Sequence, residues 1–345
     1  MSLTATAPIP TTHITTTGTM RAVSQSRYGS ADALDVTTRE IPTPAAGQVL
    51  VRVRAAGVDR GVWHLMTGRP YLIRVLGFGF RRPKQPVRGS DVAGTVVAVG
   101  PDVDRFTVGD EVFGTADGSF AEYAVARADR LASAPQSVSA AEAAVLAVSG
   151  TTAQHAVEDV ADVQPGQHVL VLGASGGVGS YAVQLAASRG ATVTGVASGA
   201  KADHVRSMGA ERVVDYRTTD IAASGELFDV IIDTGGNTPL RRLRRILSPE
   251  GTLAIVGGED GGSLTGGIGR QLTAALLSNF TSQTLAFFIT PEHFAPLERL
   301  AAHVEAGHVR APLTRRYPLA AAPDAIDDLV GGRIAGKAAV IVEEA

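Results

Sequence analysis

The chain has 345 residues, of which 45% are hydrophobic and 19% are charged, and it contains no cysteine. Its 31 Lys and Arg against 34 Asp and Glu give a formal net charge of −3, so the overall charge gives no reason to expect nucleic acid or a membrane as a partner. The absence of cysteine excludes disulfides, thiolate nucleophiles, iron–sulfur clusters and zinc sites with thiolate ligands. The length predicts two domains.

The N-terminal segment differs in composition from the rest of the chain. Residues 1–19 contain eight threonines and two prolines, and we expect a disordered leader there. This segment lacks the basic and apolar regions of a signal peptide, and no stretch approaches the roughly 18 to 20 consecutive apolar residues of a membrane span. We therefore expect a cytoplasmic protein whose ordered part begins near Met20.

The first third of the chain predicts short strands rather than helices. Val49, Val51 and Val53 alternate with other residues at nearly period two, which is typical of a strand. Gly, Pro and Asp residues separate this strand from its neighbours. Strands are predicted over 20–26, 48–56, 92–99, 109–113 and 119–125. Several short strands with this punctuation favour a small barrel-like domain.

From about residue 139, helices and strands alternate. Ser139 and Glu142 form a capping-box pattern at the start of an alanine-rich helix over 139–148. Strands are predicted over 168–172, 191–197, 212–215, 228–233 and 251–256, and helices over 178–189, 201–208 and 239–247. The alternation predicts an α/β fold with a parallel, doubly wound sheet. A helix over 291–305 and a strand over 338–342 complete the chain.

A glycine-rich turn joins the first predicted strand of this region to the helix after it. Residues 173–179 read GASGGVG. Gly173 would allow a tight turn, Gly176 would let the backbone approach a pyrophosphate, and Gly179 would let helix and strand pack closely. The helix would then present its free N–H groups to the phosphates. The alternative is a glycine-rich turn that binds no ligand.

The end of the second strand bears on which dinucleotide would bind. An NAD site usually has an acid about 20 residues after the glycine motif, on the ribose hydroxyl. This chain has no acid there; Ser198 and Lys201 occupy the place. A hydroxyl and an ammonium suit a 2′-phosphate, so we expect NADPH. The alternative is that Lys201 is a solvated lysine at the start of a helix.

The chain resembles the medium-chain dehydrogenase/reductase superfamily, and within it the zinc-independent quinone oxidoreductases, over about residues 20–345. The resemblance implies a GroES-like β-barrel catalytic domain over 20–138 and 291–345, and a Rossmann NADP-binding domain over 139–290. The matching stretches are YGSADALDV (28–36), AAGVDRGVWHLMTG (55–68), GSDVAGTVVAVG (89–100), FTVGDEVFG (106–114), GASGGVGSYAVQLA (173–186), MGAERVVDYR (208–217), DTGG (233–236) and GKAAVIV (336–342).

The resemblance also implies which residues contact the cofactor and how the chain assembles. The family commonly forms homodimers by pairing the edges of its Rossmann sheets, so a homodimer is expected. The implied contacts are Ser198, Lys201 and Tyr216 at the 2′-phosphate and adenosine, Ser175, Gly176, Gly177 and Val178 at the pyrophosphate, and Val256, Gly257 and Gly258 near the nicotinamide.

The zinc-dependent branch of this superfamily differs at its metal ligands. Those relatives carry a cysteine where this chain has Asp59, and a His-Glu pair where it has Ser90 and Asp91. A serine and a carboxylate are poor replacements for an imidazole and a thiolate, and a catalytic zinc needs three good protein ligands. We therefore expect no metal site.

Without a Lewis acid, a hydride acceptor must already be electrophilic, as quinones and α,β-unsaturated carbonyls are. The candidate proton donors are Asp59, His64 and Tyr71. His64 could titrate near neutral pH, and Tyr71 carries a phenolic proton. Each has a simpler alternative: Asp59 could satisfy a loop backbone, His64 could be a surface residue, and Tyr71 could serve packing.

Residues 72–86 read LIRVLGFGFRRPKQP, a loop longer than is usual in the family. One interpretation is a mobile lid over a hydrophobic or anionic acceptor. The other is a surface loop whose apolar residues pack on the barrel. Basic and aromatic residues also occur together in single-strand nucleic-acid binders, but the net charge and the lack of an RNA-binding motif argue against that partner.

The sequence thus predicts an NADPH-dependent reductase of quinones or α,β-unsaturated carbonyls that acts on a small molecule. One alternative is a specialised biosynthetic reductase of a single conjugated intermediate, which needs the same apparatus. The other alternative is a protein that binds NADPH without catalysis.

Overall fold

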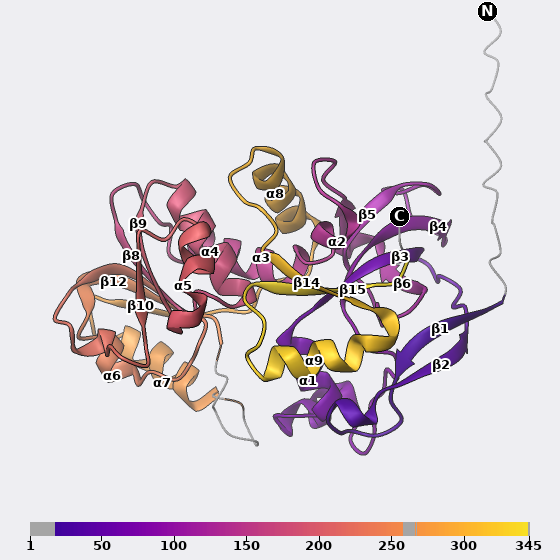
Figure 1. The fold of residues 1–345 in the computed structure, drawn as a ribbon, viewed down its shortest axis with the longest axis horizontal. Helices are drawn as coiled ribbons and strands as arrows, with labels where there is room; N and C mark the ends of the chain where they lie inside the picture. Colours follow the sequence, from indigo (N-terminus) through magenta and orange to yellow (C-terminus); the bar gives the residue numbers. More distant parts are fainter. Residues whose placement is uncertain (1–17, 258–265, 267, 344–345) are drawn as a thin grey trace, which may run out of the picture.

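The structure is a computed structural model, and it describes residues 18–257, 266 and 268–343. The described residues form two sheet-based parts with helices between and around them (Figure 1). The expected leader lies almost wholly outside the described residues. No helix of the described residues is both long enough and apolar enough to cross a membrane.

The six-stranded sheet is parallel throughout and lies on the left in Figure 1. Its strands, in spatial order, are β10 (Arg212–Asp215), β9 (Thr192–Ala197), β8 (His168–Leu172), β11 (Phe228–Asp233), β12 (Leu247–Ile255) and β13 (Thr284–Phe287). Counted along the chain, this order is 3-2-1-4-5-6, the doubly wound order of dinucleotide-binding folds. The order reverses between β8 and β11, and ligands of such sheets bind at the strand ends beside that reversal. The parallel α/β part is therefore as the alternation predicts.

The second sheet is mostly antiparallel and contains strands from both ends of the described chain. Its strands are β14 (Leu313–Pro318), β15 (Lys337–Ile341), β3 (Gln48–Val58), β4 (Asp91–Val99), β5 (Glu111–Thr115) and β7 (Leu131–Ser133), with β6 (Tyr123–Arg127) also paired to β3. A separate hairpin joins β1 (Thr19–Ser24) to β2 (Asp35–Glu40). Because β15 pairs with β3, the late strands complete the sheet that the early strands begin. The domain limits expected at residues 139 and 291 stay a prediction.

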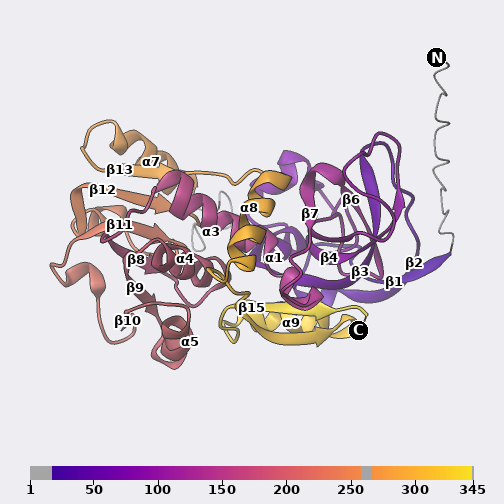
Figure 2. The ribbon, with the colours of Figure 1, turned by 90° about the horizontal axis from the view of Figure 1, so that it is seen from above.

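Helices cover both sheets and fill the region between them (Figure 2). They are α1 (Arg60–Thr67), α2 (Ala140–Ala143), α3 (Ala147–Gln154), α4 (Gly177–Ser188), α5 (Ala202–Ser207), α6 (Leu240–Leu243), α7 (Ile268–Ser278), α8 (Phe294–Glu305) and α9 (Ala322–Val330). Short helical turns include π-helical segments over Arg74–Phe78 and His155–Val160 and a 3-10 turn over Gly199–Lys201.

Several element boundaries differ from the sequence prediction. The strand expected over 119–125 is β6, which begins only at Tyr123, and the strand expected over 251–256 is β12, which begins at Leu247. Three further differences have a local reason. The helix expected over 139–148 is two helices, although its capping box forms as expected between Ser139 and Glu142. The helix expected over 239–247 ends at Leu243, because Leu247 already pairs with β11. The strand β5 begins two residues later than expected, since the Asp110 carboxylate accepts from the Thr107 N–H at 2.8 Å and holds a turn there.

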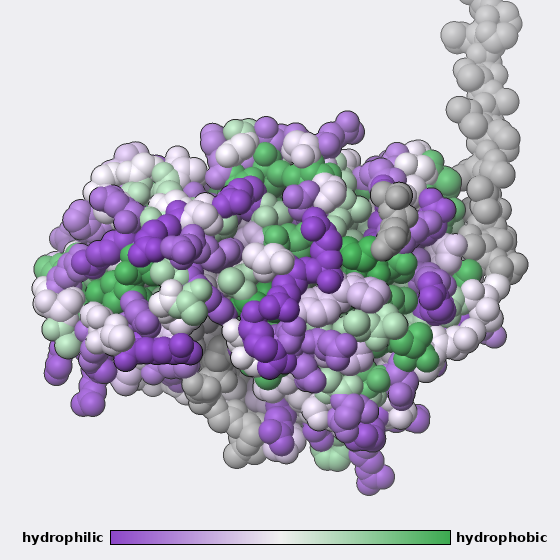
Figure 3. All heavy atoms as spheres, in the orientation of Figure 1, coloured by the Kyte–Doolittle hydropathy of each residue, from purple (hydrophilic) through white to green (hydrophobic). Residues whose placement is uncertain are grey.

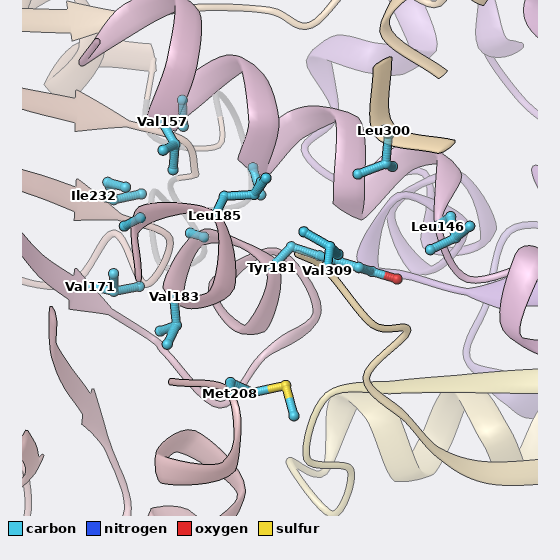
Figure 4. Packing of buried hydrophobic residues seen from close by; sticks show 14 of the residues in the cluster. Leu146, Val157, Val171, Tyr181, Val183, Leu185, Met208, Ile232, Leu300 and Val309 are labelled. Atoms are coloured by element: carbon cyan, nitrogen blue, oxygen red, sulfur yellow. The ribbon is translucent and has the colours of Figure 1, made fainter. Parts of the chain in front are cut away.

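The largest hydrophobic cluster runs from one part into the other. It contains Ala55 and Phe113 of the antiparallel sheet together with Val169 and Val171 of the parallel sheet. Figure 4 shows Tyr181 of α4 in this cluster, with its hydroxyl directed toward the segment around Leu146. That hydroxyl donates to the Val145 carbonyl at 2.9 Å, so a buried phenol is satisfied by the helix pair that links the parts.

Candidate functional site

The glycine-rich loop lies where the order of the parallel sheet reverses. Gly173 follows β8 with a positive φ of 75°, a conformation that favours glycine. A Cβ at Gly173 would lie 2.5 Å from the Thr234 hydroxyl oxygen, which follows β11. That hydroxyl in turn donates to the Leu172 carbonyl at 2.7 Å. The loop and the end of β11 are thus packed too closely for any side chain at residue 173.

The first turn of α4 is shaped to receive an anion. Gly176 precedes the helix in an extended conformation, and no side chain caps the N–H groups there. A Cβ at Gly179 would lie 2.2 Å from the Gly173 carbonyl oxygen, whereas a Cβ at Gly176 would meet nothing closer than 3.4 Å. Gly179 therefore serves the contact between helix and strand, and Gly176 leaves open space above the helix. Uncapped N–H groups beside open space fit a pyrophosphate.

The segments after β9 and β10 bring two cations, Lys201 and Arg217, close together. Lys201 donates from Nζ to the Ile334 carbonyl at 2.6 Å, and Ser198 is buried beside it in the sequence. Burial lowers the pKa of Lys201, and the charge of Arg217 lowers it further. Tyr216 is exposed, next to Arg217. Sequence reasoning missed Arg217, although it belongs to the MGAERVVDYR stretch that resembles the family.

The remaining expected cofactor residues follow β12. Val256 is half-buried, and its N–H donates to the Asp233 carbonyl at 3.0 Å. A Cβ at Gly257 would lie 3.2 Å from the Thr234 carbonyl oxygen, so this strand end also approaches the reversal point. Gly258 lies outside the described residues.

An ion pair that the sequence did not predict lies at the same ends of the strands. The carboxylate of Asp233, at the end of β11, is buried and pairs with the Arg270 guanidinium from α7. Arg270 also donates to the Thr238 carbonyl at 3.0 Å, but its Nε and Nη1 atoms are buried without a hydrogen-bond partner among the described residues. A half-buried arginine with unused donors can bind a further acceptor.

In the antiparallel part, Asp59 begins α1. Its Oδ1 accepts from the Val62 N–H at 3.2 Å, which makes Asp59 the N-cap of the helix. Its Oδ2 is buried and has no hydrogen-bond partner within the described residues. The simpler alternative for Asp59, a backbone contact, is therefore present, but it uses only one of the two oxygens.

The other two candidate proton donors lie near the end of α1 and beyond it. His64 Nδ1 lies 2.9 Å from the Arg69 carbonyl oxygen. Because a carbonyl can only accept, Nδ1 carries a hydrogen, and Nε2 of neutral His64 is an acceptor. His64 can therefore donate a proton from Nε2 only as the imidazolium. The exposed Tyr71 ring lies under the Arg74 guanidinium, 4.8 Å from its centroid.

A buried polar cluster lies directly behind the glycine-rich loop. The Lys337 ammonium is 3.5 Å from Asp91 Oδ2 and donates to the Ser149 hydroxyl at 3.2 Å. A Cβ at Gly177 would lie 2.8 Å from Lys337 Cδ, so the lysine stem packs against the loop. Burial raises the pKa of Asp91 to about 7, against the opposing charge of Lys337. The charge of Asp59 raises it further.

The structure thus places the expected cofactor residues that it describes after the carboxyl-terminal ends of the strands of the parallel sheet. It does not bring Asp59, His64 and Tyr71 into mutual hydrogen bonds, and their roles stay predictions. Lys337 was missed as a site residue, although GKAAVIV was one of the matching stretches. Among the residues that the structure describes, no three His, Cys, Asp or Glu side chains are grouped as metal ligands would be.

Comparisons with known proteins agree with this architecture. The family "Alcohol dehydrogenase GroES-like domain" matches residues 45–136, "Zinc-binding dehydrogenase" matches 208–340, and "NAD dependent epimerase/dehydratase family" matches 169–238. A chloroplastic quinone oxidoreductase, QR1, of Triphysaria versicolor is 33% identical over 346 residues, which cover 94% of this chain and 98% of that protein.

Two solved structures extend the comparison. The quinone oxidoreductase of Coxiella burnetii is 25% identical, with a TM-score of 0.82 over 94% of this chain and 100% of that one. The structure of a mycobacterial protein complexed with NADPH is 27% identical, with a TM-score of 0.78 over 94% of this chain and 100% of that one. The chain therefore belongs to the quinone oxidoreductase branch of the medium-chain dehydrogenase/reductase superfamily and is an NAD(P)-dependent oxidoreductase.

Proposed function

We propose that this protein uses NADPH to reduce quinones or α,β-unsaturated carbonyls. The observation that carries the choice of cofactor is the end of β9, where the sequence has Ser198 and Lys201 and no acid. The positive charges of Lys201 and Arg217 lie close enough for the second to lower the pKa of the first. Two cations interact more strongly with an anionic 2′-phosphate than with a neutral ribose hydroxyl. The mycobacterial relative complexed with NADPH supports the same cofactor.

In this proposal the glycine-rich loop binds the pyrophosphate, and the chain's remaining polar groups position the acceptor. The nicotinamide, when bound, supplies the hydride. Ser175, Gly176, Gly177 and Val178 would hold the phosphates, and Val256, Gly257 and Gly258 would lie along the nicotinamide. Asp59 offers an unused buried oxygen for orienting the acceptor or passing a proton. His64, as the imidazolium, or Tyr71 would protonate the reduced acceptor.

A steady-state comparison tests the proposal. NADPH and NADH would be supplied in turn with quinones, enones, aldehydes and alcohols, and oxidation of the cofactor would be followed by its absorbance. We expect turnover with conjugated acceptors, at higher kcat/KM with NADPH. Turnover confined to a single elaborate enone would favour the specialised biosynthetic reductase. Cofactor binding with no turnover of any acceptor would favour the non-catalytic alternative, and oxidation of alcohols alone would contradict the proposal.

We also propose a cytoplasmic homodimer formed at the edge of the parallel sheet. The strand β13 is one of the two edge strands of the parallel sheet, and α7 beside it exposes Leu272 and Leu276 one turn apart, with Phe280 just beyond the helix. An apolar stripe beside an unpaired edge is typical of an interface. Light scattering should give twice the chain mass for the wild type. Leu272→Asp with Leu276→Asp should lower it to one chain mass, whereas an unchanged mass would place the interface elsewhere.

A further inference from the structure

One exposed segment has no part in the proposed reductase site. After α1, the π-helical turn and the residues behind it expose Val75, Leu76, Phe78 and Phe80, which we call the apolar tip. The exposed fractions are 70% for Val75, 67% for Leu76 and 72% for Phe80. Scattered apolar side chains are common on surfaces, but neighbouring large ones mark a site of interaction. One interpretation of the sequence expected the apolar residues of this loop to pack on the barrel. For the residues of the apolar tip that interpretation is wrong.

The base of the apolar tip is held firmly against the antiparallel part. The Arg74 guanidinium lies 4.2 Å over the Tyr28 ring and donates to the Gly68 carbonyl at 2.9 Å and the Thr67 carbonyl at 3.1 Å. The Tyr28 hydroxyl donates to the Gly79 carbonyl. These contacts fix the two ends of the turn, so the side chains between them project outward. A lid would have to release them to fold inward.

Positively charged residues flank the apolar tip in the sequence. From Arg60 to Ser90 the chain has seven Lys and Arg and no Asp or Glu. Arg69, Arg81, Arg82 and Lys84 are exposed, and none of them forms an ion pair within the described part of the chain. The net charge of the whole chain, −3, conceals this local excess. Exposed apolar side chains flanked by exposed cations fit a partner that is anionic outside and apolar beneath.

We propose that this segment docks the protein on the surface of an anionic lipid bilayer. Val75, Leu76 and Phe80 enter the boundary between headgroups and acyl chains, and the flanking cations pair with lipid phosphates. Both terms contribute to the affinity of interfacial segments. A second copy of this chain fits poorly, because a symmetric contact would place the same cations against each other. Single-stranded nucleic acid would use the cations but leave the aliphatic tip side chains exposed.

The position of the apolar tip means that docking on a bilayer would affect how acceptors reach the proposed reductase site. Pro70 packs against Gly266, beyond β12, so the segment borders the parallel part as well as α1. Figure 1 shows α1, which carries His64, at the lower edge of the molecule, and Figure 3 shows mostly hydrophilic residues along that edge in the same view. Docking would turn this edge toward the bilayer, where lipophilic acceptors dissolve. Binding to lipid is measured without cofactor or acceptor, so the proposal stands or fails separately from the proposed function.

Vesicle sedimentation tests the proposal. The full chain would be mixed with vesicles of phosphatidylcholine alone and of phosphatidylcholine with phosphatidylglycerol, at low and high salt. We expect binding to the mixed vesicles that weakens with salt, and little binding to the neutral ones. A tip variant, Leu76→Ser with Phe80→Ser, and a charge variant, Arg81→Glu with Arg82→Glu, should each bind at least tenfold more weakly while keeping the wild-type melting temperature.

Two matched variants serve as controls. Val108→Ser with Leu227→Ser changes two exposed apolar side chains elsewhere, and Arg241→Glu with Arg245→Glu makes the same charge change on another exposed basic run. Both should bind as the wild type does. The proposal is overturned if the wild type ignores anionic vesicles, or if the controls lose as much affinity as the test variants. It is also overturned if the protein binds a single-stranded oligonucleotide but not vesicles. A tip variant that keeps its affinity for vesicles and changes only the apparent mass, or only the KM for a water-soluble quinone, would overturn it as well.

Discussion

Comparing a methyl group added at Gly179 with one added at Gly176 should separate the packing role of the glycine-rich loop from its proposed binding role. The new Cβ at Gly179 would lie 2.2 Å from the Gly173 carbonyl oxygen and 2.8 Å from Ala174 Cα. An ordinary carbon–oxygen contact is about 3.3 Å, so α4 would have to move about 1 Å from β8. Both contacts are to backbone, which cannot turn aside as a side chain would. Overpacking of this kind costs about 1–3 kcal/mol, and a shift of both elements belongs at the upper end.

Two effects of Gly179→Ala oppose each other. Alanine within a helix gains about 1 kcal/mol over glycine, which lowers the net loss to about 2 kcal/mol. For a domain of this size that loss corresponds to a fall in Tm of about 4–8 °C. Differential scanning calorimetry measures the change in Tm, and isothermal titration measures NADPH affinity. We expect Gly179→Ala to lower both, because displacing α4 also displaces the N–H groups of its first turn.

The matched control is Gly176→Ala, three residues earlier in the same loop. Its Cβ would meet nothing closer than 3.4 Å, so the wild-type Tm should be kept. The added methyl would stand in the space proposed for the pyrophosphate, so NADPH should bind at least tenfold more weakly. A stable Gly179→Ala protein with wild-type affinity would refute the packing argument. Unchanged affinity in Gly176→Ala would refute the proposed position of the pyrophosphate.

Three further predictions concern charged residues of the site. Lys201→Glu should weaken NADPH binding about 10- to 100-fold, because a charge-assisted hydrogen bond contributes about that much affinity. NADH binding should be nearly unchanged. If titrations show equal losses for both cofactors, Lys201 does not contact the 2′-phosphate. Burial raises the pKa of Asp91 from 3.8 to about 7, so between these values the folded chain holds a proton there that the unfolded chain has released. The free energy of unfolding of the wild type relative to Asp91→Asn should therefore fall as the pH rises through this window and level off above it; denaturant titrations showing a rise would contradict this assignment. Asp59→Asn should keep the N-cap of α1 and the wild-type Tm but lower kcat. Asp59→Ala should lower kcat and also lose about 1 kcal/mol of stability, because the cap is lost. If both variants have the wild-type kcat, Asp59 serves only as a capping residue.

Local patterns predicted much of the fold, because strand and helix periods are properties of neighbouring residues. The alternation from residue 139 and the GASGGVG turn were enough to predict the parallel sheet and the place of its loop. The end of α6 was not predictable in the same way: Leu247 fits an apolar helix face in the sequence, but it pairs with Phe228 of another strand. Tertiary pairing decided that boundary, and no local signal reports it.

The candidate site was predictable only where its residues share a motif. Ser198 and Lys201 follow a recognisable strand, so their place could be inferred from position alone. Lys337 packs against Gly177 across a long separation in sequence, and its burial depends on the two parts meeting. Arg270 likewise reaches Asp233 from a later helix. Such contacts arise from the assembled fold, which is why single-sequence reasoning did not find them.

Strand β15 contacts the glycine-rich loop but is synthesised long after it, so the loop can reach its final structure only late in synthesis. The start of the strand reaches the loop directly. The N–H of Gly336, which immediately precedes β15, donates to the Ser175 carbonyl at 2.8 Å, and Lys337, the first residue of β15, lies behind Gly177. The same strand pairs with β3, more than two hundred residues earlier. A nascent chain can form the parallel sheet as it emerges, but its glycine-rich loop lacks this support until β15 has left the ribosome. We therefore expect ribosome-bound chains that stop before β15 to carry a folded sheet and a loop open to protease.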